Sequence, residues 1–411
     1  MSRLLVRMAW ASLCVRATRS FMVVLMISVS LWSLLLMQGI YDGMTEQMIS
    51  NAISSDSGDL SLFARGYRLD PSLENMIPDT FRDGRRITDT LYRDSRVRSF
   101  VKRLQQNGVV ATARYSRNAG IRGVDLSAEE THGRLRRSIL AGEYGFGTKG
   151  RGAILGYGLA EKLHVTVGSK IIVSCQNRDA EVVSTALKVT GIIKTNNMAL
   201  DEATVFMALE RAGEFFGAGR ASTQISVMTA DASDAGNLQK DLLRSFPELD
   251  VLRWDELYPA LMQSRVIMKG FRLVVSLIIF AVAGLGIVAV MMVSIMERRR
   301  EIGVMLALGT RFSQIRTMVL IESLIMGLSG FAVGALAGLG SLLYFRTFGL
   351  DLRVFSDAFE EFGMDAVTYA LLHFEYFATP FLAIVSASVI SVYFPLRMLA
   401  KGSPVKIINE I

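Results

Sequence analysis

Few residues of this sequence have the types and spacing that catalysis or cofactor binding requires. The glycine-rich stretch 142–150 comes closest to a phosphate-binding loop, but it lacks the spacing of G-x-x-x-x-G-K-[ST] and has no Ser or Thr after Lys149. The three histidines, His132, His164 and His373, are scattered without the spacing of metal ligands. Neither a serine nucleophile elbow nor an H-E-x-x-H motif is present. We therefore expect a non-catalytic chain, with no cofactor or metal ion of its own, that takes its energy from a partner or a gradient.

The densest array of charged side chains is the block E-R-R-R-E at residues 297–301, which the apolar run I-G-V-M-L-A-L-G-T follows at 302–310. It lies between two long uncharged segments, 273–296 and 323–345. Because charged side chains are costly inside a bilayer, a block of this size between two spans must leave the membrane. We expect a helix here that another protein contacts, through Glu297, Arg298, Arg300, Glu301, Ile302, Gly303, Leu306, Gly309 and Thr310.

The elements that position this block are membrane spans. A spanning helix needs roughly 20 apolar residues. Four segments qualify by their lack of charge: 20–41, 273–296, 323–345 (in a helix expected to begin at 317) and 376–396. Since 51% of the residues are hydrophobic and yet 20% are charged, a sizeable water-facing part must accompany the spans. The predicted fold class is a membrane α-helical protein with four transmembrane helices and a large extracytoplasmic α+β domain between the first two.

A cleaved signal peptide is the alternative interpretation of the first span. The uncharged stretch 20–41 is longer than a typical signal-peptide core, and no small-x-small cleavage site follows it. These two observations favour a retained anchor.

The distribution of Lys and Arg predicts the orientation of the spans. Basic residues dominate the segment 1–19, the loop 297–316 and the tail 397–411, whereas the loop 346–375 carries six acidic residues against two arginines. The positive-inside rule places the basic segments in the cytoplasm. The segment 42–272 and the loop 346–375 then lie outside. The net charge of +7 comes without a basic run that interleaves aromatic residues, so nucleic-acid binding is not expected.

The outer segment is predicted to be an α+β domain, built of two subdomains, whose ends are helices. Ile40, Met44, Met48 and Ala52 recur every four residues, which is typical of an amphipathic helix. Such extensions of the spans would form a stalk, and the alternative is a helix that lies on the membrane surface. Apolar patterns place strands at 59–63, 109–115, 153–156, 167–173, 187–193 and 224–228, and helices at 93–107, 159–163, 206–217 and 234–246.

Two features of the third span bear on partners. Gly330, Gly334 and Gly338 form a doubled G-x-x-x-G pattern, which lets another helix approach closely. That helix belongs either to this chain or to a second membrane subunit, and we prefer the second because four helices are few to enclose a pathway. Glu322 lies at the cytoplasmic edge of the span. It is expected to pair with Arg316 or to contact another helix, and it gives weak support to proton coupling.

Three motifs resemble FtsX-like ABC-transporter permeases. The block 297–310 resembles the signature E-R-x-x-E-I-G-x-x-x-A-x-G-[AT], Glu322 with its following glycines resembles E-x-x-x-x-G-x-x-G, and 395–405 resembles the C-terminal P-x-R-x(6)-P-[VL]. The stretch from Ile154 to Lys170 is similar to the periplasmic domain of MacB and of the LolC/LolE lipoprotein-releasing permeases. The resemblance implies a non-catalytic permease subunit in a bacterial inner membrane. It would work as a dimer with an identical or homologous permease, together with two ATPase subunits that carry the ATP and Mg²⁺.

The resemblance leaves several functions open. MacB-type efflux pumps carry their ATPase on the same chain, and this sequence shows none. A separate permease with one large outer domain fits the lipoprotein-releasing type best, which implies lipoprotein substrates drawn from membrane lipids and a periplasmic chaperone as a further partner. Efflux of small amphiphiles is one alternative. A membrane scaffold that regulates cell-wall hydrolysis is the other.

Overall fold

The computed structural model describes residues 17–84, 86–148, 150–195, 197–352 and 367–400, which form two compact units. The helical unit contains the described residues up to Thr45, from Arg265 to Leu352 and from Val367 onward, and the α+β unit contains those from Glu46 to Ser264. The expected segments 1–19, 346–375 and 397–411 fall partly outside the described residues, so part of the predicted periplasmic loop and most of both terminal segments remain predictions.

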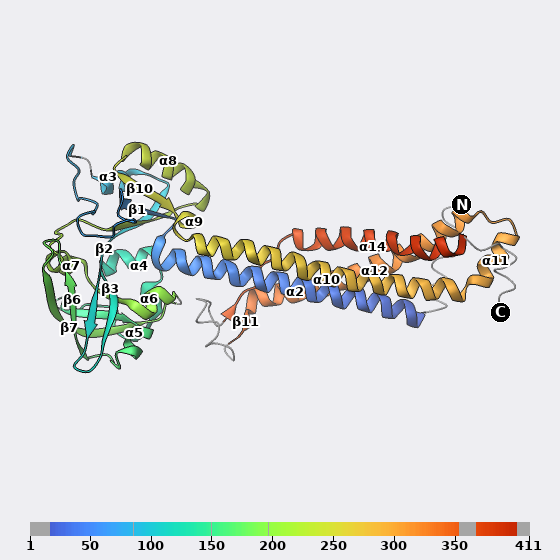
Figure 1. Cartoon of the computed structure of the whole chain (residues 1–411), viewed down its shortest axis with the longest axis horizontal. Helices are drawn as coiled ribbons and strands as arrows, with labels where there is room; N and C mark the ends of the chain where they lie inside the picture. The colour runs from blue at the N-terminus through green and yellow to red at the C-terminus, as the bar shows by residue number, and fades with distance from the viewer. Residues whose placement is uncertain (1–16, 85, 149, 196, 353–366, 401–411) are drawn as a thin grey trace. The chain divides into compact units, whose positions relative to one another are not determined.

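The long helices of the described residues lie wholly or mostly in the helical unit (Figure 1). They are α2 (Ala17–Ala52), α10 (Pro259–Glu297), α12 (Phe312–Phe348) and α14 (Glu375–Ala400), with the short α11 (Arg299–Ala307) between α10 and α12. Within the described residues, four helices are long and apolar enough to cross a membrane. A two-residue strand pair, β11 (Leu350–Asp351) with β12 (Val367–Thr368), follows α12.

The core of the helical unit forms where α2, α12 and α14 pack together. Ile27, Leu31 and Leu35 of α2 are each at most 2% exposed, and they share one apolar cluster with Met326 of α12 and Ile384 of α14. Helix α10 contributes less: only 6% of its most apolar stretch is buried, against 33% to 39% for the other three. Most of the second span therefore presents apolar side chains outward.

The α+β unit is built on a ten-stranded sheet with the order β10-β1-β9-β2-β3-β8-β5-β7-β4, in which β6 also pairs with β2 and β7. The strands are β1 (Leu60–Ala64), β2 (Val97–Ala111), β3 (Ser116–Val124), β4 (Ile139–Gly142), β5 (Gly152–Gly156), β6 (Lys170–Gln176), β7 (Val182–Ile193), β8 (Thr204–Ala208), β9 (Gln224–Thr229) and β10 (Leu249–Arg253). The helical pieces are η1 (Ile53–Ser57), α3 (Ile87–Arg93), α4 (Leu126–His132), η2 (Leu135–Ser138), α5 (Tyr157–Lys162), α6 (Met198–Ala203), α7 (Leu209–Phe215), η3 (Ala232–Asp234), α8 (Ala235–Ser245) and α9 (Trp254–Leu257).

The long strand β2 connects two apolar cores within this unit. Val97 and Phe100, near its start, pack against the core formed by β1, β9, β10 and α8. Leu104 and Val110, further along, lie in the core formed by β5 to β8 with α5 and α7. The parts of the unit around these two cores, which we call its lobes, thus share one strand, and a division into two subdomains stays a prediction.

Two predicted helices are wrong. Residues 93–107 were expected to be helical from the spacing of their apolar residues, but 97–111 is the strand β2. The helical prediction failed because the spacing of apolar residues treats every arginine as a surface residue. Arg103 is instead buried beside Val101 on the same face of the strand. The predicted helix 206–217 divides into the end of β8 and the helix α7, since β8 lies between two strands and is apolar on both faces.

Candidate functional site

The charged block breaks the chain into α10 and α11 at Arg298. This residue has φ −94° and ψ 8°, outside regular helix, and α11 starts immediately after it. Ile302 is 2% exposed and shares an apolar cluster with Ile295 of α10 and with Ile315 and Val319 of α12. Helix α11 is therefore fixed to both neighbouring helices through its buried side.

Gly309 and Thr310, two further residues of the charged block and its apolar run, end helix α11. Gly309 has φ +92°, a left-handed conformation that glycine adopts without strain. Its N–H donates to the Leu306 carbonyl at 3.0 Å, and the N–H of Thr310 donates to the Met305 carbonyl at 3.0 Å. These two bonds form a Schellman motif, which ends the helix and turns the chain toward α12.

The other face of α11 is open. Arg300, Glu301 and Val304 are exposed, and the side chain of Leu308 is 82% exposed at the tip of the turn. Charged groups thus surround an exposed apolar pair, a composition that fits a protein contact. The predicted coupling residues divide accordingly: Ile302 and Gly303 are buried, Leu306 is half-buried, Thr310 is partly exposed, and Glu297, Arg300, Glu301 and Gly309 are exposed.

Arg298 joins the block to the third span. Its Nη1 donates to Oε2 of Glu322 on α12 at 3.1 Å, and its Nε donates to Oε2 of Glu301 at 3.2 Å. The side chains of Arg298 and Glu322 are 15% and 7% exposed, so this ion pair is largely shielded from water. Of the two alternatives expected for Glu322, the contact with another helix is confirmed, because Arg298 directly follows α10. The pairing with Arg316 is wrong, since Arg316 is exposed and Arg298 is the partner.

The glycine row of α12 packs within this chain. A Cβ at Gly330 would lie 2.7 Å from the Cβ of Ile27, and one at Gly334 would lie 2.8 Å from the carbonyl oxygen of Ser28. A Cβ at Gly338 would likewise lie too close to the side chain of Leu35. Helix α2 therefore fills the groove, and the preferred interpretation of this face as a contact for a second permease subunit is corrected: the close approach is intramolecular.

Three helices of the same unit meet at one carboxylate. Arg272 of α10 donates from Nη1 to both oxygens of Asp42 on α2, at 2.8 and 2.7 Å. The hydroxyl of Tyr376 on α14 donates to Oδ2 of Asp42 at 2.6 Å. Nothing in the sequence pointed to this contact, since its members are far apart in the chain.

The α+β unit contains a buried ionic cluster where the two stalk segments enter it; we call Asp56, Arg103, Arg122, Glu129 and Tyr258 the stalk junction. Asp56 lies in the π-helix η1, which continues α2, and Tyr258 immediately precedes α10. Arg122 Nη1 donates to Oδ1 of Asp56 at 2.6 Å, and the Tyr258 hydroxyl donates to Oδ2. One carboxylate thus binds both stalk segments to β3.

Arg103 completes the stalk junction from β2. It is 2% exposed and holds Glu129 of α4 with two bonds, from Nε at 2.6 Å and from Nη2 at 2.9 Å, while its Nη1 donates to the Asp56 carbonyl. Burial would raise the pKa of Glu129, but the charge and hydrogen bonds of Arg103 outweigh it and hold the pKa below its ordinary value. Nothing in the sequence pointed to this cluster, since Arg103 lay in a segment that was expected to be helical and Arg122 lay in none of the predicted strands.

His132 lies beside this cluster. Its Nδ1 is 3.0 Å from Ser99 Oγ and its Nε2 is 2.8 Å from Ser226 Oγ. Burial, followed by the positive charge of Arg103, lowers the pKa of His132 from 6.5 to about 4. The imidazole is therefore neutral at neutral pH. His164 is exposed and lies against the ring of Tyr115, and His373 lies against Tyr376 in the helical unit, so the structure keeps the three histidines apart.

Comparison with known families covers most of the chain. The MacB-like periplasmic core domain matches residues 20–245, and the FtsX-like permease C-terminal domain matches residues 273–404. The first match spans most of α2, four of the five residues of the stalk junction and most of the sheet. The second contains α11, the Arg298–Glu322 pair and the glycine row.

Individual relatives are more distant. An uncharacterized ABC transporter permease of Methanocaldococcus jannaschii is 26% identical over 62% of this chain and 61% of its own length. The lipoprotein-releasing system transmembrane protein LolE of Haemophilus influenzae is 23% identical over 56% of each chain. The macrolide export ATP-binding/permease protein MacB of Hyphomonas neptunium is 39% identical over 20% of this chain and 12% of its own.

The chain thus matches less than two thirds of the length of these curated relatives. The two family matches nevertheless follow one another along the chain and include both structural units. The protein belongs to the family of ABC-transporter permeases that combine a MacB-like periplasmic core domain with an FtsX-like permease C-terminal domain.

Proposed function

We propose that this chain is the permease subunit of an ABC transporter that releases lipoproteins from the inner membrane, driven by a separate ATPase dimer that docks on α11. The observation that carries the proposal is the anchoring of α11: Ile302 packs against α10 and α12, and Arg298 joins α10 to Glu322 of α12. A push on the exposed face of α11 must therefore move two spans together.

Each stalk segment then passes the movement on. Helix α2 continues into η1, where Asp56 accepts from Arg122, and α10 starts beside Tyr258, which donates to the same carboxylate. A change in the separation of the two segments must strain or break bonds to Asp56. In this proposal the stalk junction turns helix movement into rearrangement of the two lobes, and substrate shifts the balance through its differential affinity for the two states.

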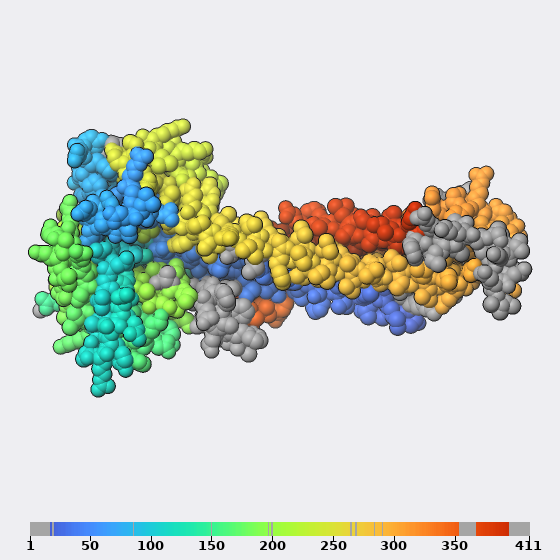
Figure 2. Space-filling model, in the orientation of Figure 1, coloured from blue at the N-terminus to red at the C-terminus, as the bar shows by residue number. Residues whose placement is uncertain are grey.

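A second permease subunit, identical or homologous, is proposed to contact α10. The exposed side chains of α10 repeat at helical spacing along one face: Ile267, Phe271, Val274, Ile278, Val282 and Leu285, each 53% to 69% exposed. Figure 2 shows this helix uncovered along the visible face. With the glycine row of α12 occupied by α2, this stripe is the most continuous apolar helix face left open among the described residues of the helical unit.

The substrate assignment is drawn from the relatives. The sequence contains no G-x-x-x-x-G-K-[ST] phosphate loop, and we propose that a separate subunit carries the ATPase. The relative LolE is named for lipoprotein release and MacB for macrolide export. Efflux of amphiphiles is therefore the second candidate. In both cases we propose an inner-membrane location with the α+β unit in the periplasm, and a periplasmic chaperone as a further partner for lipoproteins.

The test is purification and reconstitution. The full chain should co-purify with an ATPase subunit in stoichiometric amount, and the complex in proteoliposomes should release a triacylated lipoprotein when ATP is added. Glu301→Lys should reduce ATP-dependent release at least tenfold while the chain still inserts, whereas Glu375→Lys, a charge reversal at an exposed position of α14, should leave release unchanged. Normal release by Glu301→Lys would remove α11 from the coupling route. ATP-driven transport of macrolides without lipoprotein release would favour the second candidate.

A further inference from the structure

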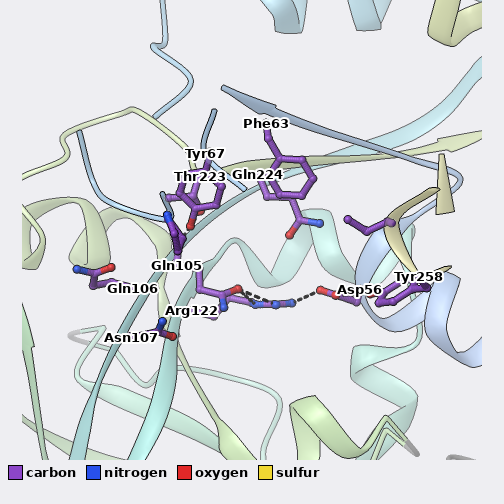
Figure 3. A pocket seen from close by; sticks show the side chains of 12 residues that line it. Asp56, Phe63, Tyr67, Gln105, Gln106, Asn107, Arg122, Thr223, Gln224 and Tyr258 are labelled. Atoms are coloured by element: carbon purple, nitrogen blue, oxygen red, sulfur yellow. Dashed lines mark hydrogen bonds and ion pairs between the residues drawn. The ribbon is translucent and has the colours of Figure 1, made fainter. Parts of the chain in front are cut away.

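The α+β unit contains a cavity of about 280 Å³ next to the stalk junction. Figure 3 shows its side chains arranged around one space, with the Asp56–Arg122 pair at one side and Phe63 and Tyr67 at the other. Neither the coupling route nor the family matches assign a ligand to it.

One wall of the cavity is an unpaired stretch of strand edge. On the side away from β3, β2 pairs with β9 up to Arg103↔Gln224 and with β6 from Gly108↔Cys175 onward. The four residues between them, 104–107, have no strand partner on that side, and Gln105, Gln106 and Asn107 line the cavity. Only the Gln105 N–H is met there by a side chain, the Thr223 hydroxyl at 2.9 Å. An open edge of this length can accept a short extended peptide as an added strand.

The cavity is electrically neutral but rich in amide groups. Its two charged residues, Arg122 and Asp56, are paired with each other. Gln105 uses its Oε1 to accept from Arg122 at 3.1 and 2.8 Å, and its Nε2 makes no hydrogen bond to any described residue. Gln224 is only 6% exposed and donates from Nε2 to Ser61 at 3.0 Å, while its Oε1 has no partner among the described residues. An acceptor and a nearby donor are thus available to a ligand.

The remaining wall is apolar or aromatic. Phe63, Tyr67, Pro71 and Leu257 complete the lining. Amide donors and acceptors beside flat apolar surfaces match a polypeptide backbone with small side chains. A charged ligand would lose its hydration here without a free counter-charge to replace it.

We propose that this cavity binds a short, extended, uncharged stretch of polypeptide, which adds to the open edge of β2 and bonds to the amides of Gln105 and Gln224. The identification of that polypeptide with part of a lipoprotein substrate rests on the proposed function, whereas peptide binding itself does not. A bound peptide lies against Arg122 and Tyr258, so occupancy of the cavity reaches the residues that hold both stalk segments.

The experiment uses the full chain in nanodiscs and a tritium-labelled neutral probe, acetyl-Ser-Gly-Asn-Gly-Ser-amide, with binding measured by equilibrium dialysis. Asn107→Trp at the exposed rim should fill the cavity and weaken binding at least tenfold. Asn237→Trp, which changes the same residue type at an exposed site of α8, should have no effect. Gln224→Leu, checked for an unchanged melting temperature, should weaken binding by a similar factor.

Competition identifies the ligand class. An unlabelled copy of the probe should displace the label, whereas analogues with three lysines or three aspartates, and the neutral sugar maltose, should compete at least tenfold less well. Equal binding by Asn107→Trp and wild type, no binding of the probe, or better competition by maltose would each overturn the proposal. Lipoprotein release is measured in parallel: probe binding without release refutes the proposed function alone, and release by a chain that binds no probe refutes the cavity alone.

Discussion

The guanidinium of Arg298 lies 3.1 Å from the carboxylate of Glu322, and both side chains are largely buried. The two residues are 24 positions apart. Arg298 immediately follows α10 and Glu322 lies on α12, so this pair links the end of α10 to α12 across α11. Removing one member of a buried ion pair is typically destabilising, and here Arg298 also donates to Glu301, so the pair belongs to a small charged network. We infer that the pair holds α11 in the orientation in which a partner can push it.

The turn after α11 should be intolerant of a side chain. Gly309→Ala places a Cβ at φ +92°, which costs about 1 kcal/mol through backbone strain alone because no atom lies within 4 Å of the added carbon. We expect faster hydrogen exchange at 305–310 and a several-fold loss of substrate-stimulated ATPase in the assembled complex. Gly219→Ala is the matched control, with φ +59° and open space, far along the chain in the α+β unit. Equal losses in both variants would argue against a special role for this turn.

The effect of a Gly→Ala substitution in α12 should depend on whether the glycine contacts α2, rather than on the helix propensity of alanine. Gly334→Ala brings a Cβ within 2.8 Å of backbone atoms of α2, so we expect destabilisation of about 1–3 kcal/mol. Gly340→Ala lies in the same helix with nothing within 4 Å, and it should be neutral or stabilising by about 0.5–1 kcal/mol. Melting temperatures of the two variants in detergent compare them directly. A destabilised Gly340→Ala, or an unaffected Gly334→Ala, would contradict the packing of α12 on α2.

The stalk junction should depend on one hydroxyl. Tyr258→Phe removes the bond to Asp56 but keeps the ring, and a hydrogen bond to a charged group is worth roughly 1.5–3 kcal/mol. We expect faster hydrogen exchange in η1 and lower substrate-stimulated ATPase, with the chain still folded. Tyr92→Phe removes a hydroxyl from an 80% exposed ring and should change neither quantity. Unchanged exchange in η1 after Tyr258→Phe would show that the hydroxyl does not hold the two stalk segments.

His132 should make the α+β unit sensitive to acid. Its folded pKa of about 4 lies below the ordinary 6.5, so the unfolded state binds the proton first. Stability is therefore fully present above pH 6.5 and falls as the pH drops toward 4, by on the order of 3 kcal/mol. The lowered pKa of Glu129 adds a further loss only below the ordinary range of a glutamate.

Urea unfolding followed from about pH 7 to about pH 4.5 checks this across the window between the two pKa values of His132. His132→Gln should flatten the decline, whereas His164→Gln, at an exposed histidine of the same unit, should leave it unchanged. A decline of equal slope in all three proteins would assign the acid sensitivity to other groups.

The long helices could be predicted from the sequence because a run of roughly 20 uncharged, mostly apolar residues is typical of a membrane span and uncommon elsewhere. The packing partner of the glycine row could not: the spacing of Gly330, Gly334 and Gly338 predicts close approach but not which helix approaches. The helix that approaches is α2, whose Ile27 and Leu35 contact the glycine face of α12 only in the folded chain.

The ion-pair sites could not be predicted from sequence patterns either, because their partners come together only through tertiary packing. The segment of β2 was predicted to be an amphipathic helix because a periodicity argument counts Arg103 as a surface residue. Arg103 is in fact buried, and its pairing with Glu129 makes that burial possible. Asp42, Arg272 and Tyr376 are separated by more than 100 positions at each step, so their contact follows from the packing of three helices. In contrast, the resemblance of 297–310 to the family signature did identify Arg298 as a coupling residue. It did not predict that Arg298 pairs with Glu322.

The most direct test of coupling through α11 is a double-mutant cycle on Arg298→Gln and Glu322→Gln, measured as ATP-dependent substrate release by the reconstituted complex. Each single variant should lose at least tenfold in release, and the double variant should be no worse than either single one, because both remove the same contact. Arg316→Gln, at the exposed arginine of the same region, should behave as wild type. Normal release by both single variants, or losses that simply multiply in the double variant, would contradict the account.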